Sequence, residues 1–108
     1  MSEIDPLLVE ADEQRRSVTL PSGQVVLIRE LTMTEFAAYG AAMGTKGTDE
    51  QRTEALARMF SCAIIREDGT PRFTLAEARK IASRARVAAP IASAIMDASG
   101  FGDGAKKD

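Results

Sequence analysis

The sequence has 108 residues, of which 44% are hydrophobic and only 5% aromatic, and its formal net charge is −2. This length suits one domain with one core, and the shortage of aromatic residues predicts an aliphatic core of closely packed helices. The acidic balance argues against a domain built to hold phosphate backbones, and no apolar run reaches the roughly 18 residues of a membrane span.

The chain divides into three parts. Residues 1–16 are acidic and mostly polar, and we expect a flexible arm with at most one short helical turn. Residues 17–100 are expected to form the single ordered domain, and residues 101–108 a disordered tail too small and polar to pack. The N-terminus lacks the basic start and apolar stretch of a signal peptide, so we expect a cytoplasmic protein.

A β-hairpin is predicted at the start of the domain. Apolar and polar residues alternate over 17–20, Pro21-Ser22-Gly23 has the composition of a tight turn, and residues 24–29 are typical of a β-strand. The second strand is apolar on both faces. In a two-stranded hairpin one of these faces would be exposed, which predicts self-association through Val25 and Leu27 and a homo-oligomer.

Three helix starts share one signature, a threonine followed three positions later by glutamate or glutamine, whose side chains can bind the unpaired backbone amides of a helix end. The pairs are Thr32 with Glu35, Thr48 with Gln51, and Thr74 with Glu77. They predict helices over about 33–43, 49–66 and 75–85.

A fourth helix is predicted to begin near residue 87 and to end near Ser99. Pro90 would lose a hydrogen bond and clash with the preceding turn deep inside a helix, so we place it in the first turn. The predicted fold class is therefore α+β and mostly α, with an N-terminal β-hairpin followed by a bundle of about four short helices.

The residues that catalysis and metal binding usually need are scarce. The chain has no histidine and one cysteine, Cys62, which excludes Ser-His-Asp and Cys-His catalysis and a structural zinc site. The acidic residues lack the spacing of a calcium loop, and the C-terminal glycines lack the elements of a phosphate loop. We therefore predict no catalytic, metal-binding or cofactor-binding residue and no enzymatic activity, and we expect Cys62 to be a buried small hydrophobe.

Two helical stretches without charge are the most informative feature. Residues 36–43 and 87–96 contain no charged side chain, and a helix without a polar face must be buried on more than one side. Either both helices form the centre of the fold, or one face of at least one stays exposed for another protein. Candidate partner-binding residues, spaced four apart on one face of each helix, are Tyr39 with Met43 and Ile91 with Ile95.

The sequence from Val18 to Gly100 resembles the tail assembly chaperones of long-tailed bacteriophages. The resemblance is carried by residues 18–23 and 26–32 of the hairpin with Glu35, by the alanine-rich helix that follows, and by residues 64–74 before two closing helices. It implies a non-catalytic cytoplasmic helper that binds the tape-measure protein and assists assembly of the tail tube, with the tail-tube protein as a further partner.

Two other functional classes remain open. A structural virion component, such as a head-tail connector or a tail subunit, would be present in finished particles, whereas a chaperone would be absent. A small helical DNA-binding regulator is less favoured, because residues 88–99, the helix that would read bases, contain no Arg, Lys, Asn or Gln. We therefore expect no nucleic-acid partner.

Overall fold

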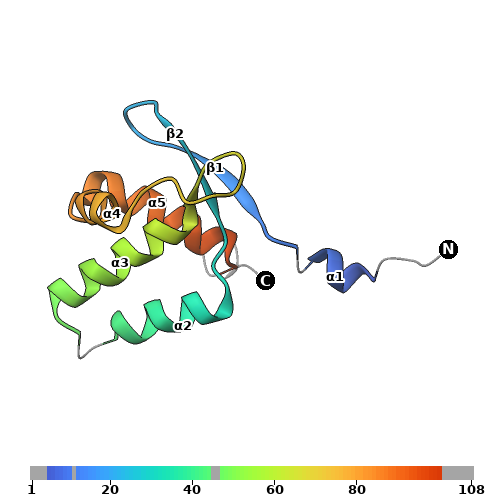
Figure 1. Ribbon diagram of the computed structural model, residues 1–108, viewed down its shortest axis with the longest axis horizontal. Helices are drawn as coiled ribbons and strands as arrows, with labels where there is room; N and C mark the ends of the chain where they lie inside the picture. Colours follow the sequence, from blue (N-terminus) through green and yellow to red (C-terminus); the bar gives the residue numbers. More distant parts are fainter. Residues whose placement is uncertain (1–4, 11, 45–46, 101–108) are drawn as a thin grey trace.

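The computed structural model describes residues 5–10, 12–44 and 47–100, and its architecture is α+β (Figure 1). Strands β1 (Arg15–Thr19), β2 (Val25–Arg29) and β3 (Ile64–Ile65) form an antiparallel sheet in the order β1-β2-β3. The helices are α1 (Pro6–Glu10), α2 (Met33–Ala42), α3 (Asp49–Ala63), α4 (Leu75–Ala82) and α5 (Ala85–Ala98). The predicted fold class, mostly helical with an N-terminal hairpin, is confirmed.

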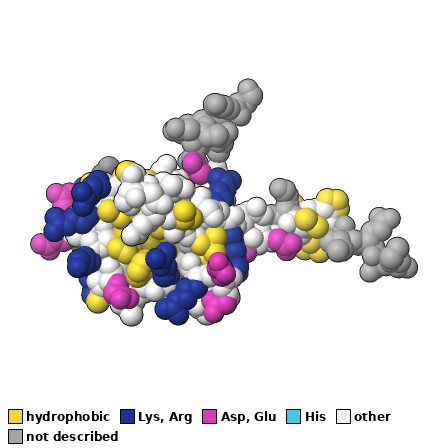
Figure 2. Space-filling view, turned by 90° about the horizontal axis from the view of Figure 1, so that it is seen from above, with side chains coloured by type: hydrophobic (Ala, Val, Ile, Leu, Met, Phe, Trp, Pro, Cys, Tyr) yellow, Lys and Arg dark blue, Asp and Glu magenta, His cyan; other side chains and the backbone are white. Residues whose placement is uncertain are grey.

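Helix α1 stands apart from the body of the protein (Figure 1). It is the single helical turn predicted for the arm, and its hydrophobic side chains are exposed on the projecting segment (Figure 2). The sheet begins earlier than the predicted boundary at residue 17, because Arg15 already pairs with Arg29 and the Gln14 carbonyl accepts a hydrogen bond from the Glu30 amide at 2.9 Å. The predicted disordered tail, residues 101–108, lies outside the described residues.

The hairpin turn follows its sequence prediction. Thr19 pairs with Val25, and the Leu20 amide donates to the Gln24 carbonyl at 2.8 Å, which closes the loop. Gly23 has a φ of +92°, a backbone conformation that side chains other than glycine's rarely adopt. Glycine at this position therefore permits the tight turn.

All three predicted capping boxes are present. In each, the threonine hydroxyl accepts a hydrogen bond from the backbone amide three residues later, and the side chain of that residue accepts one from the threonine amide. The threonine amide lies 2.9 Å from Glu35 Oε1, Gln51 Oε1 and Glu77 Oε1, respectively. Helices α2, α3 and α4 consequently begin at the predicted residues.

The end of α3 differs from the prediction. The helix stops at Ala63 instead of continuing to Arg66, and Ile64–Ile65 forms β3 beside β2, with Leu27 opposite Ile65. Two β-branched residues at a helix end favour the extended conformation when a strand is available to pair with them. The sheet therefore has three strands rather than the two of an isolated hairpin.

Helix α5 begins at Ala85, so Pro90 lies in its second turn. The sequence prediction, which placed Pro90 in the first turn, was therefore wrong. Proline at this position cannot donate a hydrogen bond to the carbonyl of Arg86, four residues earlier. Arg86 is exposed, so water can hydrate that carbonyl, and the rest of the helix continues. Helix α4 correspondingly ends at Ala82, earlier than predicted.

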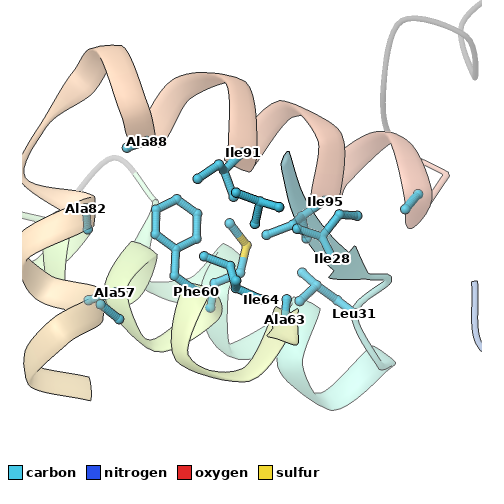
Figure 3. Packing of buried hydrophobic residues seen from close by; sticks show 14 of the residues in the cluster. Ile28, Leu31, Ala57, Phe60, Ala63, Ile64, Ala82, Ala88, Ile91 and Ile95 are labelled. Carbon is cyan, nitrogen blue, oxygen red and sulfur yellow. The ribbon is translucent and has the colours of Figure 1, made fainter. Parts of the chain in front are cut away.

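The hydrophobic core lies between the sheet, α3 and α5 (Figure 3). Phe60 of α3 and Ile28 of β2 are fully buried, and Ile91 and Ile95 of α5 point toward them, with exposed fractions of 2% and 0%. The prediction that Ile91 and Ile95 belong to a partner-binding face is therefore wrong in this fold, because the sheet and α3 cover that face of α5. Of the two helices that contain the charge-free stretches, α5 is the central one.

Candidate functional site

Helix α2 is the charge-poor helix that the fold leaves uncovered. None of its ten residues is buried, although residues 36–42 carry no charge. Figure 1 shows α2 and α3 as a helical hairpin at the edge of the molecule, with α3 on one side of α2 only. Phe36 and Tyr39 pack partly against the core, and the remaining apolar surface of α2 faces outward.

A groove of about 930 Å³ runs between α2 and α3. The α2 side is formed by Glu35, Ala38, Tyr39, Ala41 and Ala42, and the α3 side by Glu50, Gln51, Glu54, Ala55, Arg58, Met59 and Cys62. Leu31, Gly47 and Thr48 complete the lining. The volume is in the range of binding pockets, and a mostly apolar lining suits the apolar face of a helix.

The start of α2 is held in place by a partly buried ion pair. Arg29, at the end of β2, donates from both terminal nitrogens to the two carboxylate oxygens of Glu35, at 2.8 and 2.7 Å. The Leu31 amide between them donates to the Ser99 hydroxyl at 2.9 Å, which ties the same segment to the end of α5. These contacts fix the direction in which α2 leaves the sheet, and this direction opens the groove.

The same pair controls the charge of Glu35. The hydrogen bonds from Arg29 lower the pKa of the Glu35 carboxyl from 4.5 to about 2, and the Thr32 amide adds to the effect. The side chains of Arg29 and Glu35 are only 15% and 27% exposed, so water screens the interaction weakly. Glu35 therefore stays ionised well into the acid range.

This pKa shift predicts a loss of stability in acid. Because the folded-state pKa lies below the unfolded value, the stabilisation is complete above about pH 5 and disappears as the pH falls toward 2, an effect on the order of 2 to 3 kcal/mol. Glu35→Gln keeps the capping box but removes the charge, so thermal melting from pH 7 to pH 2 should show a lower melting temperature at pH 7 and a smaller acid-induced fall. Glu67→Gln, at an exposed position, is the control, and equal acid sensitivity of Glu35→Gln and the parent would contradict the assignment.

The opposite wall of the groove carries a second ion pair. Arg79 of α4 donates to both carboxylate oxygens of Glu54 on α3, at 2.8 and 2.9 Å. Arg79 thereby lowers the pKa of the Glu54 carboxyl. Arg58 lies farther from the same carboxylate, at 3.6 Å, and its side chain is 69% exposed. Arg58 is thus the groove-lining cation best placed to meet a negative charge on a ligand.

The predicted site residues are distributed over three environments. Tyr39 is half-buried and lines the groove, and burial raises the pKa of its phenol, which stays neutral. Met43 is partly exposed just beyond the end of α2 and does not line the groove, whereas Ile91 and Ile95 are core residues. The structure therefore does not bring the four residues together.

The residues predicted for self-association lie on the sheet, away from the groove. Val25 is exposed, but Leu27 is half-buried, and the two neighbouring strands place Ser17 and Ile65 beside it. The expectation of a two-stranded hairpin is corrected, because β3 pairs with β2 at Leu27 and Ile28. Self-association through Val25 and Leu27 stays a prediction.

Sequence reasoning missed most of the α3 wall. Gln51, Ala55, Arg58 and Cys62 recur at spacings of four, three and four residues, which places them on one helix face beside the core stripe. This mixed pattern is an ordinary solvent-facing one, so only the position of α2 makes it part of a groove. The expectation that Cys62 is a buried core residue is corrected as well, because its side chain is half-buried in the groove lining.

Metal-binding clusters and membrane-spanning helices are both absent from the part of the chain that the structure describes. Within residues 5–10, 12–44 and 47–100, His, Cys, Asp and Glu side chains form no group of three or more that could hold a metal ion. Among the same residues, no helix is both long and apolar enough to cross a membrane.

Comparison with known proteins identifies a similar fold. A solved structure of the bacteriophage HK97 tail assembly chaperone matches with a TM-score of 0.52 and 14% sequence identity, over 82% of this chain and 85% of that chain. No protein-family model matches the sequence, and no curated protein matches it. At this identity the likeness concerns the fold alone.

Proposed function

We propose that this protein is a phage tail assembly chaperone that binds the tape-measure protein through the groove between α2 and α3 and assists assembly of the tail tube without catalysis. The observation that carries the proposal is α2, whose charge-free residues 36–42 are left unburied beside an open, mostly apolar groove. The fold of the HK97 tail assembly chaperone supports the same assignment.

The groove favours a helical ligand. Small side chains on α2, among them Ala38, Ala41 and Ala42, allow a third helix to approach closely, while Met59 and Leu31 offer an apolar floor. An amphipathic helix of the tape-measure protein could lay its apolar face along this surface, as in other helix-in-groove complexes. Covering that face in the cytoplasm would prevent aggregation before the tail-tube protein assembles around it.

Coexpression tests the proposal. The partner is the product of the very long open reading frame expected downstream of the gene, produced alone and together with this chain. We expect the tape-measure protein to be insoluble alone and to co-elute with the chaperone when both are present. A tape-measure protein that stays insoluble, with the chaperone eluting by itself, would overturn the proposal.

Analysis of finished particles separates a chaperone from a structural virion component. Mass spectrometry of purified virions should detect the tape-measure and tail-tube proteins but not this chain. Stoichiometric recovery of the chain from virions would instead favour a head-tail connector or tail subunit.

A further inference from the structure

The arm before the sheet carries an apolar surface that the described part of its own chain does not cover. Leu7, Leu8 and Val9 of α1 have exposed fractions of 74%, 66% and 52%, and they make up half of the exposed large hydrophobic residues in the described part of the chain. Figures 1 and 2 show α1 away from the body. A helix of five residues is marginal in water by itself, so packing of these three side chains against another surface would stabilise α1.

The path of the arm leads away from the groove of its own chain. Hydrogen bonding with β2 continues to Gln14, whose carbonyl accepts from the Glu30 amide, and the Gln14 side chain donates to the Asp12 carbonyl at 3.1 Å. The Asp12 amide in turn donates to the Val9 carbonyl at 3.1 Å. These bonds join the arm to the sheet, and α1 lies to the side of the body, on the far side of it from the connection between α2 and α3 (Figure 1).

The arm and the groove are complementary in polarity. Residues 1–14 contain five acidic side chains and no lysine or arginine. In the groove, Arg29 and Arg79 neutralise two of the carboxylates, while Arg58 has only a 3.6 Å contact with the already paired Glu54. The remaining lining acid, Glu50, lies eight residues before Arg58 on α3, or about 12 Å along the helix. An acidic, leucine-bearing segment therefore fits the Arg58 end of the groove.

We infer that the groove between α2 and α3 of one copy binds α1 of a second copy. Leu7, Leu8 and Val9 cover the apolar lining, and the acidic residues that flank them approach Arg58. The inference rests on the proposed function in one respect: a helix of the tape-measure protein must displace α1 from the same groove.

The native thiol of Cys62 in the groove lining allows a direct test. In Leu8→Cys, oxidation of the protein at high micromolar concentration should form a covalent dimer, and peptide mapping should find position 8 of one copy joined to Cys62 of another. Lys80→Cys, an exposed position on α4, controls for random collision. Adding Cys62→Ala to Leu8→Cys should remove the specific link.

Assembly without cross-linking gives a second measure. Leu8→Asp should weaken self-association at least about tenfold in light scattering, because a charge cannot enter the apolar lining. Leu8 is exposed and outside the core, so folding should be unaffected. Met33→Asp is the matched control: it places the same charge on an exposed apolar residue of α2 that does not line the groove, and it should leave the mass unchanged.

The outcomes are distinct. Two cross-linking results would overturn the inference: a link between position 8 and Cys62 within one chain, or no link above the level of the Lys80→Cys control. In light scattering, an oligomer that is weakened by Val25→Asp but not by Leu8→Asp would overturn it as well. Failure of the inference leaves capture of the tape-measure protein intact, whereas failure of the proposed function leaves the cross-link between copies intact. Where both hold, Leu8→Asp should bind the partner more tightly because its groove is open.

Discussion

Replacing Ile95 with aspartate is expected to unfold the protein. Ile95 is completely buried, and its side chain points toward Ile28 and Phe60 in the centre of the core (Figure 3). The change removes an isoleucine from the core and buries a carboxylate without a partner, with a combined cost of at least about 5 kcal/mol. This cost is comparable to the whole stability of a small domain, about 5 to 15 kcal/mol.

Circular dichroism and thermal melting measure this effect, with Ile95→Val as the control. The valine variant keeps an apolar, β-branched side chain and should lose only about 1 kcal/mol, so it should melt cooperatively a few degrees below the parent. A folded Ile95→Asp protein with an unchanged melting temperature would mean that this face of α5 is exposed. That result would restore Ile95 as a candidate partner-binding residue.

Replacing Ala38 with aspartate is expected to abolish binding of the tape-measure protein while the fold persists. Ala38 is exposed and lines the groove, so the new charge stays hydrated in the free protein but loses its water when an apolar helix docks. A penalty of about 3 kcal/mol corresponds to a roughly 100-fold weaker complex. Tyr39→Asp should have a similar effect on binding, with some loss of stability because Tyr39 also packs against the core.

Ala37→Asp provides a matched control for Ala38→Asp. Ala37 is the neighbouring residue of the same helix, is also exposed, and does not line the groove. The two variants share the change in helix propensity and the added charge, so a difference in partner binding reports the groove alone. Equal binding by both variants, measured by co-elution or calorimetry, would place the partner on another surface.

The features that the sequence determined by itself are local ones. Each capping box needs only four consecutive residues, and the hairpin turn needs a glycine that can adopt a positive φ, so both can be recognised without knowing what lies nearby. The three helix starts and the hairpin turn were therefore predicted at the right residues. The absence of histidine from the sequence likewise limits the possible chemistry, because no packing of the chain can supply an imidazole that the composition lacks.

Features that depend on distant partners were predicted less well. Ile64 and Ile65 continue the apolar pattern of α3, and they become a strand only because β2 lies beside them. Pro90 lies in the second turn of α5 because this helix begins at Ala85, directly after the short turn that follows α4. For Ile64 and Ile65 the local preference was weak, and a segment elsewhere in the chain decided the outcome.

The two charge-free stretches, in α2 and α5, show what only the tertiary structure decided. By composition, residues 36–43 and 87–96 are equally suited to burial, yet α5 packs against the sheet and α3, while α2 contacts α3 along one side. The direction of α2 depends on the Arg29–Glu35 ion pair and on the bond from Leu31 to Ser99, 68 positions away. Hydrophobic burial is non-directional, so composition determines only that burial of an apolar helix is favourable. The packing of the whole chain determines which of the two helices is buried and which keeps an exposed apolar surface.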